Sequence, residues 1–385
     1  MPKSLFRRLS KKFFIISNII AAVLYIGGCY GKFFFKLGWP FGFLPLAAFY
    51  LFILLVLFIV FWLFVKRGWS LISLIAIIIT VKPFSHVIPF RSSSQFDVMA
   101  KAEDIRVMSW NVEQFDLLYY KKKPEKRDDM LALINKYKPD IACFQEMVAA
   151  DTLVNLNNPY YRRYSFVSVF EYAEKLNFPE FFFSYDFRHD FLTHQHFGTI
   201  IFSRYPIINK QRLSFPPHNY NSDFQYADIV KDGDTIRVFN IHLQSLKFSD
   251  GNKAFINDPS LESKQDLKRS RSLIYKFKQG FLLRQEQVKR VKEEIDKSPY
   301  RVIVCGDFND VPNSYAYQTI GENLQNAFEE KGSGLGRTFT GIAPTLRIDN
   351  IFVSPSFTVN QFVRLPVLLS DHFPIIADLG KEKND

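Results

Sequence analysis

The hydrophobic and polar positions divide the chain into two unlike parts. Long runs without a charged side chain occupy residues 13–31, 41–65 and 68–81. From residue 105 onward, short apolar runs alternate with polar segments instead. Long apolar runs are typical of helices, whereas runs of four to eight residues between turn signals are typical of buried strands. The pattern therefore predicts an apolar helical segment followed by a domain rich in strands.

The second run has the length and composition of a membrane-spanning helix. Its 25 residues would form about 37 Å of helix at about 1.5 Å per residue, and a helix apolar on all faces needs lipid around it. The first run follows basic residues like a signal peptide, but no small-residue cleavage site precedes the next apolar run. The third run is short for a span. We predict a membrane segment at residues 1–82, with two or three transmembrane helices at about 13–31, 41–65 and 68–82.

The net charge of +11 belongs to this segment. Residues 1–100 contain 11 Lys and Arg and one acid, whereas the remainder contains 38 basic and 37 acidic residues. Five bases precede the first run, and Lys66 and Arg67 follow the second, which favours a cytoplasmic N-terminus in a bacterial-type inner membrane. If the third run spans, the C-terminal domain lies on the non-cytoplasmic side. If it lies at the interface, the domain stays inside.

Residues 83–104, rich in Pro and Ser, are predicted to be a linker, and residues 105–380 a single domain. Apolar runs predict strands at 105–110, 141–145, 199–203, 236–243, 301–305 and 348–353. Helices are predicted at 124–137, ending ahead of Pro139, and at 284–297. Many strands with few helices indicate a layered α+β or α/β domain.

Polar side chains follow or precede most of these strands. One such residue is usually a turn or a helix cap, but the repetition favours a polar cleft where strand ends converge. Carboxylate and amide oxygens suit a hard cation such as Mg²⁺ or Mn²⁺. The chain has three cysteines and no Cys-x-x-Cys pair, which excludes a disulfide framework and disfavours structural zinc. The candidates are Asn111, Glu146, His242, Asp307, Asn309, Asp349, Asp371 and His372.

Seven motifs, six of which contain these residues, resemble the endonuclease/exonuclease/phosphatase family, which includes deoxyribonuclease I. In chain order they are SWNV (109–112), QE (145–146), GTIIFSRYPI (198–207), NIHLQS (240–245), GDFND (306–310), RIDNIFVS (347–354) and SDH (370–372). The resemblance covers the whole predicted domain. It implies an α/β four-layered sandwich, in which two packed mixed β-sheets are flanked by helices, with the site at one edge.

The resemblance also implies a role for each candidate residue. Glu146 would be the principal ligand of Mg²⁺ or Mn²⁺, with Asn111 nearby and Asp371 completing or supporting the site. The catalytic residues would have the following roles: Asp307 deprotonates the attacking water, Asn309 orients phosphate and water, Asp349 holds His372 in one tautomer, and His242 faces the phosphate as a proton donor. Deoxyribonuclease I has a glutamate near that histidine, on the strand aligned with residues 198–203, where this chain has no carboxylate.

These features predict a membrane-anchored, divalent-metal-dependent phosphoesterase. The favoured form is an endonuclease/exonuclease-type phosphodiesterase acting on nucleic acid. The alternative is a phosphatase of lipid-linked phosphates or pyrophosphates, or a sphingomyelinase-like lipid phosphodiesterase, because an anchor would hold such an enzyme at its substrate. A module that only binds is disfavoured, since every motif acid and histidine is intact. The expected partners are the lipid bilayer and the phosphate-ester substrate, and no protein partner is inferable.

Four further features receive structural interpretations. Ten bases among residues 264–292 predict a solvated helical face, or alternatively an arm that binds nucleic-acid phosphates or lipid headgroups. Residues 332–336 (GSGLG) lack the Lys of a phosphate loop and are expected to form a flexible loop near the site. His189, His194 and His196 are expected in an aromatic loop rather than at a second metal. Cys143 and Cys305 are expected to be buried thiols.

Overall fold

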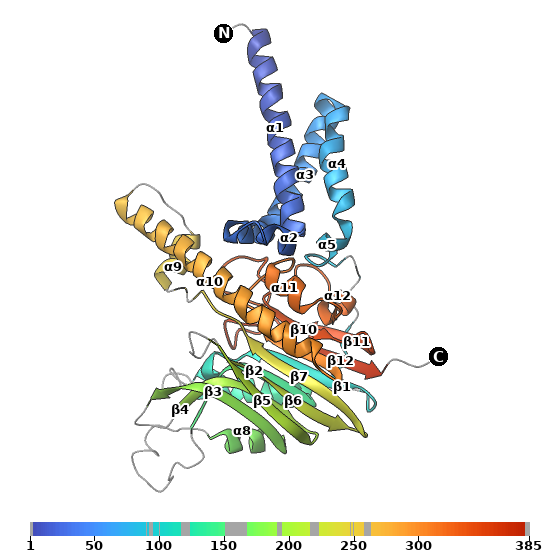
Figure 1. Cartoon of the computed structure of the whole chain (residues 1–385), viewed down its shortest axis with the longest axis vertical. Coiled ribbons are helices and arrows are strands. Elements are labelled where there is room, and N and C mark those ends of the chain that lie inside the picture. The colour runs from blue at the N-terminus through green and yellow to red at the C-terminus, as the bar shows by residue number, and fades with distance from the viewer. Residues whose placement is uncertain are drawn as a thin grey trace.

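The computed structural model places a helical bundle at the N-terminus on one side of an α/β body (Figure 1). The bundle is built from the segment that carries the long apolar runs, and the body from the segment with short ones. The described residues are 3–89, 91, 95–99, 101–116, 124–150, 168–190, 195–215, 223–246, 248, 250–257 and 263–381.

The bundle contains two helical stretches, Leu9–Cys29 and Trp39–Val65, that are long and apolar enough to cross a membrane. Helices α1, α3 and α4 pack together, and α4 runs back along α3 (Figure 1). Many large apolar side chains stay on the outside, such as Leu57 at 59% exposure and Ile75 at 56%. The elements are α1 (Lys3–Cys29), α2 (Gly31–Phe35), α3 (Phe43–Val65), α4 (Ser70–Ile79) and α5 (Val81–Ser85), with 3₁₀ turns at Trp39–Gly42 and Arg67–Trp69.

The third apolar run is divided between two helices. Helix α4 ends at Ile79, because Thr80 leaves the helical conformation at φ −109° and ψ 5°, and α5 begins one residue later. Part of the predicted linker is also fixed against the body. Asn313 Nδ2 donates to the Pro83 carbonyl at 2.7 Å, and His86 Nδ1 lies 2.8 Å from Glu329 Oε2.

The first sheet has six strands in the order β11-β12-β1-β2-β4-β3. β1 and β2 are parallel, and the other neighbours are antiparallel. β2 is longer than predicted because it continues past a register shift between Phe144 and Met147. The strands are β1 (Ile105–Asn111), β2 (Ile141–Ala150), β3 (Glu180–Asp190), β4 (Gln195–Ser203), β11 (Phe357–Arg364) and β12 (Ile375–Lys381).

The second sheet also has six strands, in the order β5-β6-β7-β8-β10-β9. Here β7 and β8 form the parallel pair at the centre, so both sheets are mixed. The strands are β5 (Ile207–Ser214), β6 (Asp223–Lys231), β7 (Asp234–His242), β8 (Arg301–Asp307), β9 (Gln325–Asn326) and β10 (Asp349–Val353).

Three apolar layers hold the body together. The central layer joins the inner faces of the two sheets, with Val107 and Ile201 from one sheet and Ile303 and Ile351 from the other. The outer layers place α6 (Pro124–Tyr137) and α8 (Val169–Lys175) against the first sheet, and α10 (Lys264–Asp296) and α11 (Tyr315–Ile320) against the second. Burial of this apolar surface is the main stabilising contribution. The result is the helix–sheet–sheet–helix sandwich that the sequence predicts. Short helices α9 (Asp250–Asn257) and α12 (Ala327–Lys331) complete the body.

A buried polar network crosses the central layer. Gln145 Nε2 on β2 donates to Asn240 Oδ1 on β7 at 2.7 Å. Asn240 Nδ2 donates in turn to the carbonyl oxygens of Phe144, at 3.0 Å, and Ile200, at 2.8 Å. Both amide side chains are fully buried, so these bonds are needed to offset their desolvation. The network ties the two sheets together directly beside Glu146 and close to His242.

The bundle and the body meet through close contacts. A Cβ on Gly31, the first residue of α2, would lie 2.2 Å from the Asn313 carbonyl oxygen, so only glycine fits there. The Lys32 amide donates to Gln318 Oε1 at 2.9 Å. Near the start of α3, the Phe43 ring lies 5.0 Å from the Phe277 ring of α10. Helix α10 therefore contacts both the bundle and the second sheet.

Helix α10 joins two features that the sequence treats separately, the basic stretch at 264–292 and the helix expected at 284–297. It begins with a capping box, in which Ser263 accepts from the Asp266 amide. Several of its bases form ion pairs within the helix, including Lys289–Glu286 at 2.8 Å and Arg269–Asp266 at 3.7 Å. These ion pairs favour the interpretation of residues 264–292 as a solvated helical face over an arm that binds phosphates.

Candidate active site

The candidate residues meet because the parallel strand pairs end at the same edge of the sandwich. β1 and β2 finish side by side, with Asn111 paired to Gln145. β7 and β8 do the same in the second sheet, where His242 is paired to Asp307. Antiparallel β10 starts opposite the end of β8. The structure brings all eight candidates together at this edge, from both sheets and from the loop before β12.

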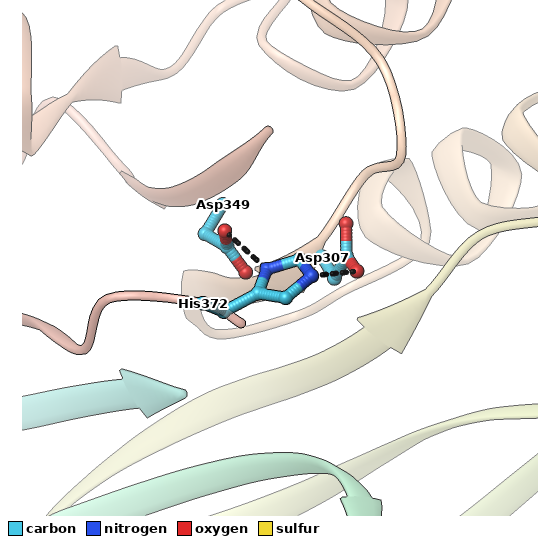
Figure 2. Close-up of side chains that lie close together, drawn as sticks. All are labelled: Asp307, Asp349 and His372. Atoms are coloured by element: carbon cyan, nitrogen blue, oxygen red, sulfur yellow. Dashed lines mark hydrogen bonds and ion pairs between the residues drawn. The ribbon is translucent and has the colours of Figure 1, made fainter. Parts of the chain in front are cut away.

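Asp349, His372 and Asp307 form a buried chain of charged groups. Figure 2 shows the imidazole between the two carboxylates: His372 Nδ1 lies 2.8 Å from Asp349 Oδ2, and Nε2 lies 3.7 Å from Asp307 Oδ2. Burial lowers the pKa of His372, but the charges of Asp349 and Asp307 outweigh that effect and raise it well above 6.5. The imidazole is therefore held in its charged form, with Nε2 directed at Asp307.

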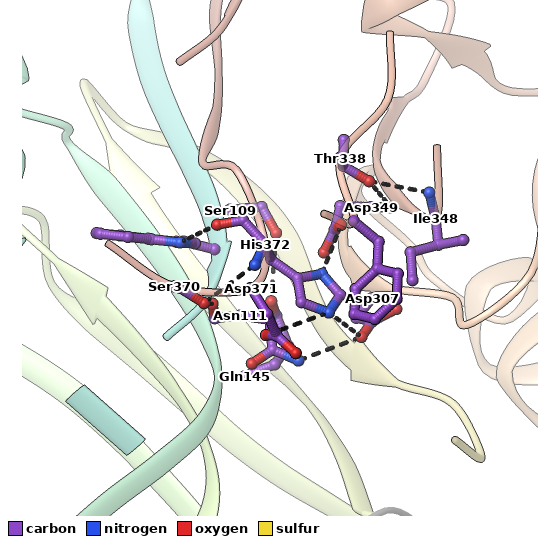
Figure 3. A network of polar contacts seen from close by, with 12 residues as sticks. Ser109, Asn111, Gln145, Asp307, Thr338, Ile348, Asp349, Ser370, Asp371 and His372 are labelled. Atoms are coloured by element: carbon purple, nitrogen blue, oxygen red, sulfur yellow. Dashed lines mark hydrogen bonds and ion pairs between the residues drawn. The ribbon is translucent and has the colours of Figure 1, made fainter. Parts of the chain in front are cut away.

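Neighbouring groups fix this chain in place (Figure 3). Thr338 Oγ1 accepts from the backbone amide of Asp349 at 3.1 Å. Ser370 Oγ accepts from the His372 amide at 3.1 Å and donates to the Asn111 carbonyl at 2.7 Å. Trp110 Nε1 donates to the His372 carbonyl at 2.9 Å. The loop that carries Asp371 and His372 is thus attached to the end of β1.

Asp307 is the centre of the site. Its Oδ1 accepts from the Asn309 amide at 2.8 Å, and its Oδ2 accepts from Asn111 Nδ2 at 3.2 Å. Oδ2 also lies 3.7 Å from His242 Nε2. Burial raises its pKa to about 7, against the lowering effect of His372. Asn309 adopts φ 49° and donates through Nδ2 to the Leu243 carbonyl at 3.0 Å, so its position is fixed by the end of β7.

A second acidic group lies on the first-sheet side. Burial, and next the charge of Asp371, raise the pKa of Glu146 to about 7, while a hydrogen bond from Asn111 opposes the rise. Burial and the same Asp371 charge raise the pKa of Glu113. The Asp371 amide donates to Glu113 Oε2 at 3.2 Å. Three carboxylates thus repel one another at one point, which is the arrangement that a bound divalent cation would relieve.

Glu113 is the site residue that the motif reading did not include. It lies two positions after Asn111, just beyond the end of a predicted strand. That position was the signal by which the sequence could have identified it. It begins a left-handed turn, Glu113–Asp116, in which all four residues have φ between 44° and 63°. Glu146 also has a positive φ, 53°, at the bulge in β2. Backbone of this kind is sparsely populated and is concentrated at functional sites.

Two groups of residues could hold a cation. The metal-ligand atoms of Asp307, Asp349 and His372 lie within 4.8 Å of one another. In that group, however, the charged imidazole already lies between the two carboxylates and offsets part of their charge. Glu113, Glu146 and Asp371 repel one another, and Lys126 is 4.0 Å from Glu113 Oε2 at their edge. The donor set of the second group, three carboxylates beside an Asn amide, fits a hard divalent cation better.

A cavity of about 330 Å³ opens from these side chains. One end is formed by Glu146, Asp307, Asp371 and His372. The other walls come from α3, α9, α10 and the segment 339–348. This volume lies at the lower end of the range for small-molecule sites.

The other histidines and cysteines that the sequence singles out have structural surroundings where the structure describes them. His196 is buried and stacks on Tyr185, with ring centroids 3.9 Å apart. The side chain of His189 and all of His194 lie outside the described residues. Cys143 and Cys305 are buried free thiols, as expected. Residues 332–336 lead into Thr338 and Phe339, and the Phe339 ring lies 5.1 Å from the His372 ring.

Solved structures similar to the chain include two bacterial proteins. One is an endonuclease/exonuclease/phosphatase from Beutenbergia cavernae, at 18% identity over 72% of each chain with a TM-score of 0.47. The other is from Bacteroides vulgatus, at 19% identity over 72% of this chain and 99% of that chain, also with a TM-score of 0.47. The human Nocturnin catalytic domain with bound sulfate has 18% identity over 73% of this chain and 95% of its own, with a TM-score of 0.46.

Family comparisons assign both parts of the chain. No curated protein matches it. Residues 11–87 match a family described as a domain of unknown function. Residues 108–372 match the family described as "Endonuclease/Exonuclease/phosphatase family". This match covers more than half of the chain and contains all eight candidate residues. The protein therefore belongs to the endonuclease/exonuclease/phosphatase family, whose members are hydrolases acting on phosphate esters.

Proposed function

We propose that the protein is a divalent-metal-dependent hydrolase of phosphate esters. The observation that carries the proposal is the pairing of two charge groups around one point. The Asp349–His372–Asp307 chain lies on one side, and His372 Nε2 is 3.9 Å from Asp371 of the acidic group on the other. Glu146, Asp371, Glu113 and Asn111 would hold Mg²⁺ or Mn²⁺. When bound, the cation would neutralise charge on the phosphate oxygens.

The side chains of the second sheet would carry out the proton transfers. Asp307, with a pKa of about 7 raised by burial, is suited to accept a proton from water near neutral pH. Asn309, fixed by Leu243, would orient that water and the phosphate. His372, kept charged by Asp349, would stabilise the negative charge that develops on the phosphate.

His242 would face the leaving oxygen. Its Nε2 lies 3.8 Å from Glu146 Oε1 and 3.7 Å from Asp307 Oδ2. The carboxylate that deoxyribonuclease I has on the strand aligned with β4 is missing here, but Glu146 of β2 is within reach of the same histidine. We infer that His242 can donate a proton to the leaving group with these acids as its neighbours.

We further propose that α1, α3 and α4 anchor the domain in a membrane. Their apolar outer surface would be costly in water, and two of their stretches have the length of a span. Because α4 returns along α3, the N-terminus and the α/β body would lie on opposite sides (Figure 1). Together with the basic N-terminus, this arrangement supports a catalytic domain on the non-cytoplasmic side.

The test uses the full chain in detergent with bis-p-nitrophenyl phosphate and p-nitrophenyl phosphate. Mg²⁺ or Mn²⁺ should be required for turnover, and Asp307→Asn should lower kcat by about 10²-fold or more. Glu174→Gln, on the exposed face of α8 away from the site, is the matched control and should keep wild-type activity. Turnover of Asp307→Asn equal to wild type would remove the basis of the assignment.

A further inference from the structure

The cavity that the carboxylates line is also lined by the bundle. Leu46 and Tyr50 of α3 line the cavity together with Phe277 and Phe281 of α10. Aliphatic side chains from the segment 339–348 complete this apolar side, Ile342 among them. The substrate site is therefore shared between the catalytic domain and a helix that has the length of a membrane span.

The wall continues along α3 beyond the cavity. Leu46, Tyr50, Leu54 and Leu57 follow one another at intervals of four, four and three residues, so they share one face of the helix. Tyr50, Leu54 and Leu57 are 46%, 40% and 59% exposed. A single apolar stripe thus runs from the cavity to the outer surface of the bundle.

The charges of the lining do not suit a polyanion. Arg284 is the one Lys or Arg among the described residues that line the cavity. It is buried, its Nε lies 3.3 Å from Asp310 Oδ2, and its Nη1 donates to the Gln244 carbonyl at 2.9 Å. Nucleic-acid grooves use several basic side chains along the phosphate backbone. Here four carboxylates line the same space.

On the basis of the proposed function, we propose that the substrate is a membrane amphiphile with a phosphate ester at its head. The phosphate lies against Asp307 and His372, and the apolar chain lies along Leu46 and Tyr50. A water-sized group occupies roughly 30 Å³, so the 330 Å³ cavity holds about ten such groups, enough for a phosphate and the first carbons of a chain. The rest of the chain follows the stripe into the bilayer. This selects the lipid-phosphate alternative over nucleic acid.

The experiment measures how activity depends on chain length. Full-length protein in nanodiscs is assayed with Mg²⁺ and butyl, hexyl and octyl phosphate. Each fully buried methylene contributes about fourfold. Octyl phosphate has four more methylenes than butyl phosphate, so its kcat/KM should be higher by about 250-fold with full burial and by at least about 16-fold if half of them are buried. Leu46→Trp should reduce this ratio to below about threefold by filling the apolar end. Leu63→Trp, exposed near the far end of the same helix, should keep the wild-type ratio.

Two further measurements keep the outcomes distinct. Ala343→Phe adds an aromatic ring to the lining of the same cavity. It should reduce the ratio as Leu46→Trp does, and it replaces that variant if Leu46→Trp does not fold. Binding of butyl- and octylphosphonate, which have no ester to hydrolyse, is measured in the wild-type protein. Stronger binding of octylphosphonate than of butylphosphonate, without turnover of any phosphate, would contradict the proposed function. It would still support an alkyl-chain binding site along α3. Equal rates for all chain lengths, or cleavage of plasmid DNA with no alkyl phosphate turnover, would overturn the inference.

Discussion

Replacing Asp349 by Asn tests whether the charged state of His372 matters for turnover. The side chains have the same shape, so the change removes a charge and leaves the volume unaltered. Asp349 Oδ2 and His372 Nδ1 are 2.8 Å apart and both residues are buried. Breaking a buried ion pair costs about 3–5 kcal/mol, and we use the lower figure because Asp307 still faces the imidazole. At about 1.4 kcal/mol per tenfold change, kcat should fall by roughly 10²-fold at pH 8.

The sign of the pH dependence follows from the same contact. In the wild type the carboxylates raise the pKa of His372 well above 6.5, against the lowering effect of burial, so the imidazole stays charged through neutral pH. Without Asp349 that pKa falls, so the deficit of the variant relative to the wild type should grow as pH rises from 6 to 8. Protonation of Asp307, whose pKa is about 7, lowers the activity of both proteins at the acid end. The assay is kcat measured across this range.

A matched variant separates this effect from general damage to β10. Asn350→Ala removes a buried side chain whose Oδ1 accepts from Asn326 Nδ2 at 3.1 Å, and it does not touch His372. It should lower the melting temperature without changing the shape of the pH profile. If folded Asp349→Asn has the wild-type profile and kcat, the role assigned to the Asp349–His372 pair is wrong.

Three other expectations concern the metal, the docking of the bundle and the topology. EDTA should abolish turnover, and Glu146→Gln should raise the half-saturating Mg²⁺ concentration by at least about tenfold, because one ligand charge is lost; an unchanged requirement would exclude Glu146 as a ligand. Gly31→Val should lower the melting temperature in detergent, since its Cβ meets the Asn313 carbonyl, whereas Gly68→Val has open space and should not. Alkaline phosphatase fused after residue 100 should be active and green fluorescent protein dark; the reverse would place the domain inside.

The sequence predicted the central strands well because each is a short apolar run with a polar residue at the end nearest the site. β1, β2, β7, β8 and β10 all have this form, and they carry most of the site. The strands that were missed lie toward the sheet edges or near the chain end. β5 is largely exposed and held by backbone hydrogen bonds to β6, so its side chains carry no hydrophobic signal.

The limits of the site prediction have a similar cause. The motifs identify Asp307, Asp349 and His372 as site residues. They do not identify residues that reach the site only through the path of the backbone. Glu113 joins the acidic group through a left-handed turn, and the wall of the cavity comes from α3 through packing between distant segments. The start of α10 was different, because Ser263 and Asp266 have the spacing of a capping box and could have been identified.

The amide pair between the sheets has a consequence for how the site keeps its shape. Gln145 immediately precedes Glu146, and Asn240 lies two positions before His242. Their 2.7 Å hydrogen bond therefore sets the distance between the proposed metal ligand and the proposed proton donor. Two leucines there would fill similar space and remove both partners of this bond, which is often nearly neutral. The carbonyls of Phe144 and Ile200 would lose the Asn240 donor, so some stability should be lost while the fold remains. The leucines would also let one sheet slide against the other. We expect such a protein to remain folded and to lose turnover, since catalysis needs an alignment that hydrophobic packing alone does not define.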